Sequence, residues 1–156
     1  MMYSCALWSE AEGGMRGDLE IGPRAGDLEA AQLRKIHHVL RAARVKPGHR
    51  VLEFGSGWGG LAIEVNVVVD VHVNRNLHRL QAARFYGCEV DTLTLSIEQK
   101  RLAEERIKEA GLESRIRVHL LDYREIPVEF EKVFDAFVSV EMLEVPPFSS
   151  LTPLPV

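Results

Sequence analysis

A ten-residue stretch, 51–60, joins a short apolar run to a glycine-rich turn and reads Val-Leu-Glu-Phe-Gly-Ser-Gly-Trp-Gly-Gly. The apolar run is typical of a buried strand. Glycines remove the Cβ obstruction, so backbone N–H groups and a helix N-terminus can approach a ligand closely. The stretch therefore predicts a strand, a tight turn and a helix that begins at a ligand site.

Glu53 lies in this stretch, two residues before the first glycine, where a buried strand should still be apolar. Buried carboxylates are normally paired, so we expect Glu53 to meet a cationic or hydroxyl-bearing group of a ligand. S-adenosylmethionine carries an ammonium, a sulfonium and ribose hydroxyls, and it meets that demand. The stretch therefore favours a methyl donor as cofactor.

The glycine spacing alone leaves two alternatives open. Gly55, Gly57 and Gly60 also satisfy the dinucleotide fingerprint, which expects an acid about 20 residues later at the end of the next strand. That next strand, 88–96, has Asp91 in its interior and ends in threonine, leucine and serine. This ending disfavours a nicotinamide or flavin site. A glycine turn that only packs a helix on a strand is the other alternative.

Size and composition exclude several classes of protein. The 156 residues correspond to about one domain, and a net charge of −4 without a basic stripe argues against a nucleic-acid partner. Cys5 and Cys88 are the two cysteines, and the scattered histidines show no metal-ligand spacing, so we expect no metal. With no signal peptide and no apolar run of 18 residues, we expect a cytoplasmic protein with at most peripheral membrane contact.

Strands alternate with helices along the chain. An irregular arm, 1–26, precedes a helix from Asp27 as N-cap to Arg44. The further expected segments are a strand at 50–54, a helix at 57–64, a strand at 89–95, a helix from the capping box Ser96–Gln99 to Gly111, and strands at 116–121 and 133–140. The predicted buried stripes of the two long helices are Leu33, Ile36, Leu40 and Ala43, and Leu102, Ala103, Ile107 and Ala110. The alternation predicts an α/β fold with a parallel, doubly wound sheet.

Five motifs occur in a fixed order: Tyr-Ser-Cys-Ala at 3–6, Leu-Glu-x-Ala-Gln at 28–32, the glycine stretch at 51–60, Thr-Leu-Ser-x-x-Gln at 94–99 and Ser-Val-Glu-Met-Leu-Glu at 139–144. With them the chain resembles the cyclopropane-fatty-acyl-phospholipid synthases and mycolic acid cyclopropane synthases over most of residues 1–144. The resemblance implies a Rossmann-like class I methyltransferase fold of seven strands. It also implies methyl transfer from S-adenosylmethionine to a cis double bond of an acyl chain, followed by proton removal that closes a ring.

The chain departs from that pattern in two places. Gly57 and Thr94 are 37 residues apart, where about 20 are usual, and removing 65–81 restores the spacing and a continuous helix. We interpret 65–81 as an insertion within a partial domain, 27–144, and as a candidate retained intron that RNA sequencing across the junction would test. The second departure is a proline-rich tail, 145–156, where the family continues with further strands. We therefore expect an incomplete form, with about four strands of seven.

The resemblance also implies roles for individual residues. Tyr3 and Ser4 close over the methionine end of the cofactor, and Glu53, Gly55, Gly57 and Gly59 hold its methionine and ribose. Thr94, Leu95, Ser96 and Gln99 surround ribose and adenine, with Asp122 and Tyr123 at the end of the third strand. Glu144 holds a bicarbonate ion that acts as the base, and Cys5 contributes a backbone group to that bicarbonate pocket.

Some of these residues have structural explanations that stay open. Ser96 is also a good helix N-cap with Gln99 as its capping partner, Tyr123 an aromatic at the edge of the core, and Gly60 a packing glycine. The expected function is methyl transfer to an unsaturated phospholipid acyl chain with ring closure. Another lipid or small-molecule methyltransferase, such as one that methylates sphingolipids, and a non-catalytic cofactor-binding remnant are the alternatives.

Overall fold

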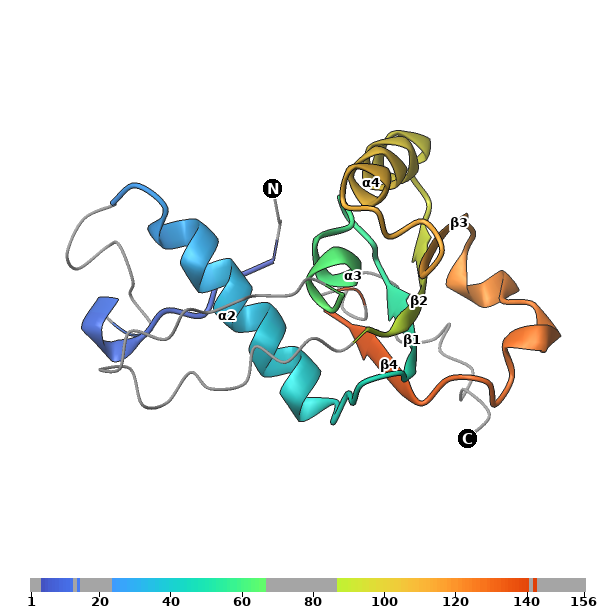
Figure 1. Ribbon diagram of the computed structural model, residues 1–156, viewed down its shortest axis with the longest axis horizontal. Helices are drawn as coiled ribbons and strands as arrows, with labels where there is room; N and C mark the ends of the chain where they lie inside the picture. The colour runs from blue at the N-terminus through green and yellow to red at the C-terminus, as the bar shows by residue number, and fades with distance from the viewer. Residues whose placement is uncertain (1–3, 13, 15–23, 67–86, 141, 143–156) are drawn as a thin grey trace.

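The sheet of this protein is parallel and has the strand order β3-β2-β1-β4 in the computed structural model (Figure 1), which describes residues 4–12, 14, 24–66, 87–140 and 142. The strands are β1 (Arg50–Phe54), β2 (Glu89–Thr94), β3 (Ile116–Leu120) and β4 (Ala136–Ser139). The helices are α2 (Asp27–Ala42), α3 (Gly60–Glu64) and α4 (Ile97–Glu109), with short 3-10 helices η1 (Glu10–Glu12), η3 (Tyr123–Glu125) and η4 (Val128–Phe130). The predicted α/β class with a parallel sheet is confirmed.

The glycine turn lies at the centre of the carboxyl edge of the sheet, because β1 lies between β2 and β4. The backbone N–H groups of Gly55 and Ser56 both donate to the carbonyl of Leu93, at 3.0 and 2.9 Å. These two bonds fix the turn to the end of β2. In an open parallel sheet, ligands bind at this edge.

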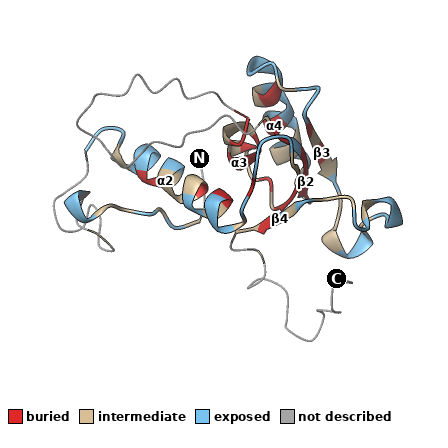
Figure 2. Ribbon diagram, turned by 60° about the horizontal axis from the view of Figure 1, so that its bottom comes forward, coloured by how far each residue is buried: buried red, intermediate tan, exposed pale blue. Residues whose placement is uncertain are grey.

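The two faces of the sheet are covered differently (Figure 2). The main core lies where α2, α3 and α4 pack on one face, and its larger members are Ile36, Leu40, Val51, Leu61, Val65, Val90, Ile107, Ile116, Val118 and Val138. The other face carries Leu52, Phe54 and Leu93, which pack against the segment 121–134. Phe137 of β4 remains 42% exposed, so the described residues cover this second face only in part.

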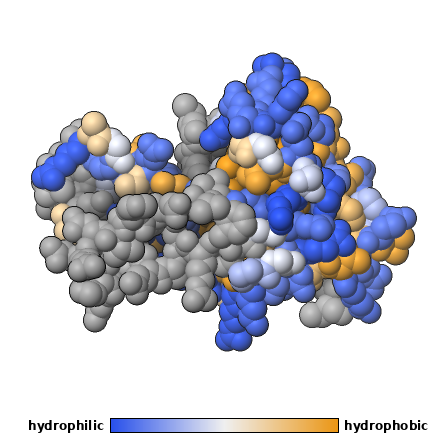
Figure 3. All heavy atoms as spheres, in the orientation of Figure 1, coloured by the Kyte–Doolittle hydropathy of each residue, from blue (hydrophilic) through white to orange (hydrophobic). Residues whose placement is uncertain are grey.

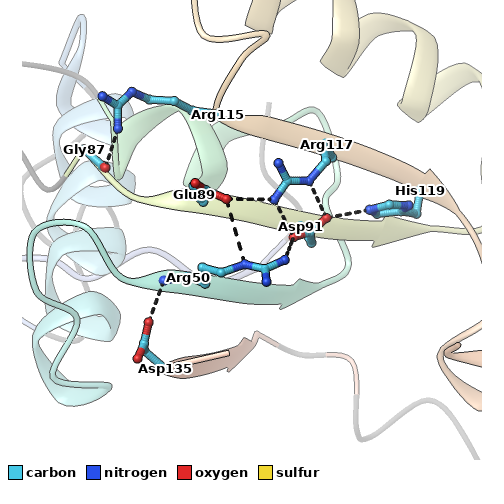
Figure 4. Close-up of polar contacts among 8 residues, drawn as sticks. All are labelled: Arg50, Gly87, Glu89, Asp91, Arg115, Arg117, His119 and Asp135. Carbon is cyan, nitrogen blue, oxygen red and sulfur yellow. Dashed lines mark hydrogen bonds and ion pairs between the residues drawn. The ribbon is translucent and has the colours of Figure 1, made fainter. Parts of the chain in front are cut away.

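A charged network occupies the second face towards the amino ends of the strands (Figure 4). Asp91 of β2 has a side chain that is only 3% exposed, and Arg117 of β3 donates to its two oxygens at 2.8 and 2.9 Å. The Nε2 atom of His119 lies 2.8 Å from Asp91 Oδ1, and Arg50 of β1 approaches Asp91 Oδ2 at 3.5 Å. Burial raises the pKa of Asp91, but the bonds from His119 and Arg117 outweigh burial and hold it far below its ordinary value.

The predicted buried stripes of α2 and α4 contain more residues than the structure buries. Ile36 and Leu40 are buried as expected, and so are Ala103 and Ile107. The flanking Leu33, Leu102 and Ala110 are exposed, so these three predictions are wrong. Each long helix contacts the core along one narrow side only, so it buries fewer residues than a full apolar stripe contains. The outer surface of α4 is hydrophilic (Figure 3) and carries pairs of opposite charge, Lys100 with Glu104 and Arg101 with Glu105.

The ends of β1 match the expected ones, and the ends of the other expected helices and strands differ by up to three residues. Gly26, in the left-handed region, caps α2 in place of Asp27, whose carboxylate accepts from the N–H groups of Arg24 and Leu28 at 2.6 Å. The helix after the glycine turn begins at Gly60 and not at Gly57, since residues 57–59 belong to the turn. Val65 and Asn66, the first residues of the expected insertion, are buried and close α3. The rest of that insertion and the proline-rich tail lie outside the described residues.

No helix within the described ranges combines the length and apolar character needed to cross a bilayer.

Candidate functional site

A cavity of about 210 Å³ opens at the carboxyl edge of the sheet, beside the glycine turn. Its walls come from the N-terminal segment, α2, the end of β1, the turn with the start of α3, the first turn of α4 and the segment after β4. The lining residues are Ser4, Lys35, Ile36, Glu53, Gly55, Ser56, Gly57, Trp58, Gly60, Leu61, Gln99, Val140 and Met142. The predicted ligand side of the sheet therefore does hold a cavity.

Glu53 is the only carboxylate among the residues that line the described cavity. Its side chain is nearly inaccessible, since the residue is 5% exposed, and its Oε2 atom has no hydrogen-bond partner among the described residues. Burial raises the pKa of the Glu53 carboxyl to about 7, and the neighbouring Thr92 hydroxyl opposes that rise. A carboxylate held in this way is a strong acceptor for a ligand cation or hydroxyl, because its own desolvation is uncompensated.

The turn adds a second unpartnered polar atom. Ser56 is buried, and its Oγ also has no hydrogen-bond partner among the described residues. Gly57 has a φ of +49°, and a Cβ at this position would meet no atom within 4 Å, so it faces open space. The turn thus leaves both polar atoms and room for a ligand.

Gly55 and Gly59 are required by the protein's own packing. Both have positive φ, at +82° and +78°. A Cβ on Gly55 would lie 2.7 Å from Cγ of Met142, and one on Gly59 would lie 3.2 Å from Cβ of Ala103 in α4. Of the last two glycines of the motif, Gly60 lines the cavity, and Gly59, which we expected at the cofactor, packs against α4.

Hydrogen bonds join three polar residues at the end of β2, namely Thr94, Ser96 and Gln99. Ser96 is the N-cap of α4 and accepts from the N–H of Gln99 at 3.2 Å. The Gln99 side chain does not reach back to the N–H of Ser96, as a complete capping box would require. Instead Gln99 Oε1 accepts from the Thr94 hydroxyl at 2.8 Å, and that hydroxyl accepts from the Ser96 N–H at 3.1 Å. Gln99 therefore reaches the cavity while Ser96 serves the helix, and Leu95 beside them is 70% exposed.

Asp122 and Tyr123 follow β3 at the same edge. Asp122 caps η3, and hydrogen bonds from the Arg124 side chain lower the pKa of its carboxyl to about 2. The Tyr123 ring lies 5.6 Å from the Phe54 ring and belongs to the core of the second face. Neither residue lines the described cavity.

The N-terminal segment is fastened to α2. The Gln32 amide donates to the carbonyl of Ser4 at 2.9 Å, and the Lys35 ammonium donates to the Ser4 hydroxyl. These bonds place Ser4 along the cavity, as expected. Cys5, next to it, is exposed and does not line the described cavity. Tyr3 and Glu144 lie outside the described residues.

Two polar residues of the cavity, Lys35 and Ser56, have no place in the expected set. Ser56 stands between two glycines of the motif, and a hydroxyl inside such a turn was a usable signal. Lys35 precedes the buried Ile36 on α2, where a lysine reads as one more solvated helix residue. Only the fold reveals that this side of α2 meets the turn.

Comparison with known proteins decides the family. The sequence profile described as mycolic acid cyclopropane synthetase matches residues 1–150. The chain belongs to this family. The tuberculostearic acid methyltransferase UfaA1 of Mycobacterium tuberculosis is 37% identical over 144 residues, which are 92% of this chain and 27% of that protein. The cyclopropane-fatty-acyl-phospholipid synthase of Escherichia coli K12 is 33% identical over 144 residues, 92% of this chain and 28% of that protein.

A solved structure of the family agrees with the fold. The cyclopropane synthase MmaA2 from Mycobacterium tuberculosis superposes with a TM-score of 0.60 at 24% identity, over 92% of this chain and 38% of that one. The Rossmann-like fold of class I methyltransferases is therefore confirmed for this family member. The chain spans little more than a quarter of the length of the curated relatives that it matches.

Proposed function

We propose that this family member forms the S-adenosylmethionine-binding part of a methyltransferase that acts on unsaturated acyl chains of lipids. The observation that carries the proposal is the buried Glu53 carboxylate, whose unpartnered oxygen belongs to a cavity lined by the glycine turn. A charged carboxylate that is buried without a partner destabilises the ligand-free fold. A ligand group that pairs with it compensates that cost, so such a carboxylate is typical of a binding site. The ammonium of the methionine moiety is such a ligand group.

The dimensions of the cavity favour one end of the cofactor. Its volume of about 210 Å³ is below the range of about 300–1,000 Å³ that is usual for sites enclosing a whole ligand of drug size. The methionine end accordingly enters the cavity beside Glu53 and Ser56, and Gly57 leaves room for it. The adenosine end lies along the carboxyl edge, with Thr94, Leu95 and Gln99 near the ribose and adenine and Asp122 and Tyr123 beyond them.

When bound, S-adenosylmethionine supplies an electrophilic methyl group for transfer to an alkene carbon. The residues of this chain hold and orient the cofactor, and such positioning is itself a large contribution to rate. By the resemblance, Glu144 with the backbone of Cys5 holds bicarbonate as the base that removes a proton after methyl transfer. Of these two residues, Glu144 lies outside the described ones.

The lipid substrate is supported by the relatives. One is a tuberculostearic acid methyltransferase and the other a cyclopropane-fatty-acyl-phospholipid synthase, and both match the same 92% of this chain. We expect an acyl chain of a phospholipid as the acceptor, reached through peripheral membrane contact, with ring closure after methyl transfer. Methylation without ring closure is the second candidate, because the methyltransferase relative is the more similar of these two, at 37% against 33%.

Calorimetry tests the cofactor assignment. The purified chain should bind S-adenosylmethionine and its demethylated product, S-adenosylhomocysteine, and should bind NAD at least tenfold more weakly. Binding of NAD without binding of either adenosyl compound would overturn the proposal, because the glycine turn would then serve a dinucleotide.

A further inference from the structure

The helix α4 contacts the glycine turn at two points. It lies next to the start of α3 (Figures 1 and 2), and its Ala103 is the residue that a Cβ on Gly59 would meet. One helical turn later, the partly buried Arg106 guanidinium donates to the backbone carbonyl of Trp58 at 2.7 Å. A cation in the last turn of a helix is favourable in itself, because it faces the negative end of the helix dipole. The structure gives this guanidinium a second partner, outside its own helix.

The peptide unit between Trp58 and Gly59 is held at both of its polar atoms. Its carbonyl accepts from Arg106, and its N–H, which belongs to Gly59, donates to the carbonyl of Ser56 at 2.8 Å. Gly59 has a φ of +78°, and glycine adopts positive and negative φ with similar ease, so the backbone itself allows this peptide to rotate by about half a turn. Such a rotation would break both hydrogen bonds and reverse the directions of the carbonyl and the N–H.

This peptide belongs to a wall of the cavity. Trp58 and Gly60, on either side of Gly59, both line the cavity. The start of the turn is fixed by its hydrogen bonds to the Leu93 carbonyl of β2, and Arg106 of α4 supplies the corresponding attachment at its end. The shape of the wall therefore depends on the orientation of that peptide.

We infer that Arg106 is a positioning residue for cofactor binding, because its guanidinium selects the orientation of the peptide between Trp58 and Gly59 and so fixes the cavity wall at the glycine turn. Arg106 does not itself line the described cavity, so it acts through this peptide and not by touching the ligand. The inference rests on the proposed function, and it extends the residues needed for cofactor binding to a helix position outside the glycine motif.

Amide hydrogen exchange and calorimetry test the inference together. In Arg106→Met the Gly59 amide should exchange about tenfold or more faster than in the wild type, since loss of the bond from a charged donor lets the peptide turn away from Ser56. The Gly55 amide, which is bonded to Leu93, should change within about twofold and is the internal control. Affinity for S-adenosylhomocysteine should fall about tenfold, because apparent affinity falls with the fraction of chains in the binding-competent form.

Matched variants separate this role from the general effect of a cation at the end of α4. Lys108→Met removes the other cation of the last turn, an exposed one, and should alter neither the exchange of Gly59 nor the affinity. Arg106→Lys keeps a cationic donor and should retain most of both properties. Arg106→Gln has a shorter, uncharged side chain and should show the same losses as Arg106→Met, so it carries the comparison if Arg106→Met does not fold.

The outcomes distinguish the inference from the proposed function. A loss of affinity without faster exchange at Gly59, or faster exchange without a loss of affinity, would overturn the inference and leave the proposed function standing. Equal changes in Lys108→Met and Arg106→Met would overturn it as well, because the helix charge would then be the cause. Failure of the wild-type chain to bind S-adenosylhomocysteine would overturn the proposed function together with this role of Arg106.

Discussion

At the scale of single residues, the buried Glu53 carboxylate lowers the stability of the ligand-free fold, and we propose that the same carboxylate binds the cofactor. Its position inside β1 was predictable, because a carboxylate two residues before the first glycine stands out from an apolar run. Lys35 could not be assigned in the same way, because nothing local distinguishes it from a solvated lysine on α2. Its place in the cavity follows from the packing of α2 beside the turn, which depends on contacts between segments far apart in the sequence.

The first prediction concerns the pH dependence of folding stability. The pKa of Glu53 is about 7 in the folded chain against 4.5 for the free group, so the folded state holds the proton more tightly. The stabilisation from this proton is complete below pH 4.5 and is lost as pH rises through 7. At pH 8 the ligand-free Glu53→Gln variant should therefore exceed the wild type by about 2–3 kcal/mol in the free energy of unfolding. Denaturant titrations at pH 5 and pH 8 measure this, and a gap that does not widen with pH would contradict it.

The second prediction is the opposite trend for ligand affinity. A ligand ammonium requires the ionised carboxylate, and with a pKa of about 7 most Glu53 side chains are protonated at pH 6. Binding of S-adenosylhomocysteine should weaken about tenfold between pH 8 and pH 6. Glu53→Ala should abolish detectable binding, and Glu53→Gln should leave only weak binding without this pH trend. An equally steep trend in the Gln variant would assign the titration to another group.

At the scale of elements, the long helices and the strands followed from the sequence, but the helix ends did not. The alternation of apolar strands and helical stripes predicted every described strand, since long-range packing reinforces these local patterns. The helix ends depend on individual hydrogen bonds. Gly26 caps α2, and the Gln99 side chain bonds to Thr94 in place of the Ser96 N–H, which a pattern of residue types does not specify.

The close approach of the glycine turn to α4 gives a third prediction. Gly59→Ala places a Cβ 3.2 Å from Cβ of Ala103 at a φ of +78°, whereas Gly48→Ala has a φ of +80° and nothing within 4 Å. Both variants should lose about 1–2 kcal/mol from the left-handed backbone. Gly59→Ala should lose more in denaturant unfolding, and this excess should disappear when the substitution is made in an Ala103→Gly background and compared with Ala103→Gly alone, because a glycine inside α4 itself costs about 0.5–1 kcal/mol. Equal losses in the two single variants would contradict the packing between turn and helix.

The network around Asp91 gives a fourth prediction, which links β1, β2 and β3. Asp91→Asn leaves Arg117 and His119 without their carboxylate, and because these two side chains are 41% and 32% exposed we expect a loss of about 1.5–3 kcal/mol, as for a hydrogen bond to a charged group. Glu105→Gln removes the carboxylate of an exposed ion pair with Arg101. This substitution should cost less than about 1 kcal/mol and serves as the control. The pKa of Asp91 is depressed in the fold, so its contribution is present above the pKa of the unfolded group and is lost as pH falls below it. Wild-type stability should accordingly decline more steeply than that of Asp91→Asn in acid titrations below about pH 4.

At the scale of the whole molecule, the described residues form one well-covered face of the sheet and one partly covered face. Phe137 is 42% exposed beside the buried Phe54, with the two rings 4.6 Å apart. The resemblance predicted the cofactor edge and an incomplete sheet, which would leave an acyl chain only partly enclosed. What it could not supply is the set of contacts that close the cavity, because those combine the N-terminal segment, α2 and the residue Met142 after β4.

The fifth prediction follows from this partial enclosure. The 156-residue chain should bind cofactor but yield no methylated or cyclopropanated lipid when incubated with labelled S-adenosylmethionine and unsaturated phospholipid vesicles. Chemistry of this type requires exclusion of water and close alignment, and a displacement of about 1 Å costs roughly a hundredfold in rate. Labelled lipid above the level without protein would show that these residues suffice for catalysis.

The central claim is that the cavity beside Glu53 holds the amino-acid end of the cofactor. A crystal structure of the chain with S-adenosylhomocysteine tests it most directly. We predict the α-ammonium within hydrogen-bond distance of Glu53 Oε2 and the adenosine along the carboxyl edge of β2. A ligand bound with its amino-acid end outside this cavity, or at another part of the molecule, would contradict the account.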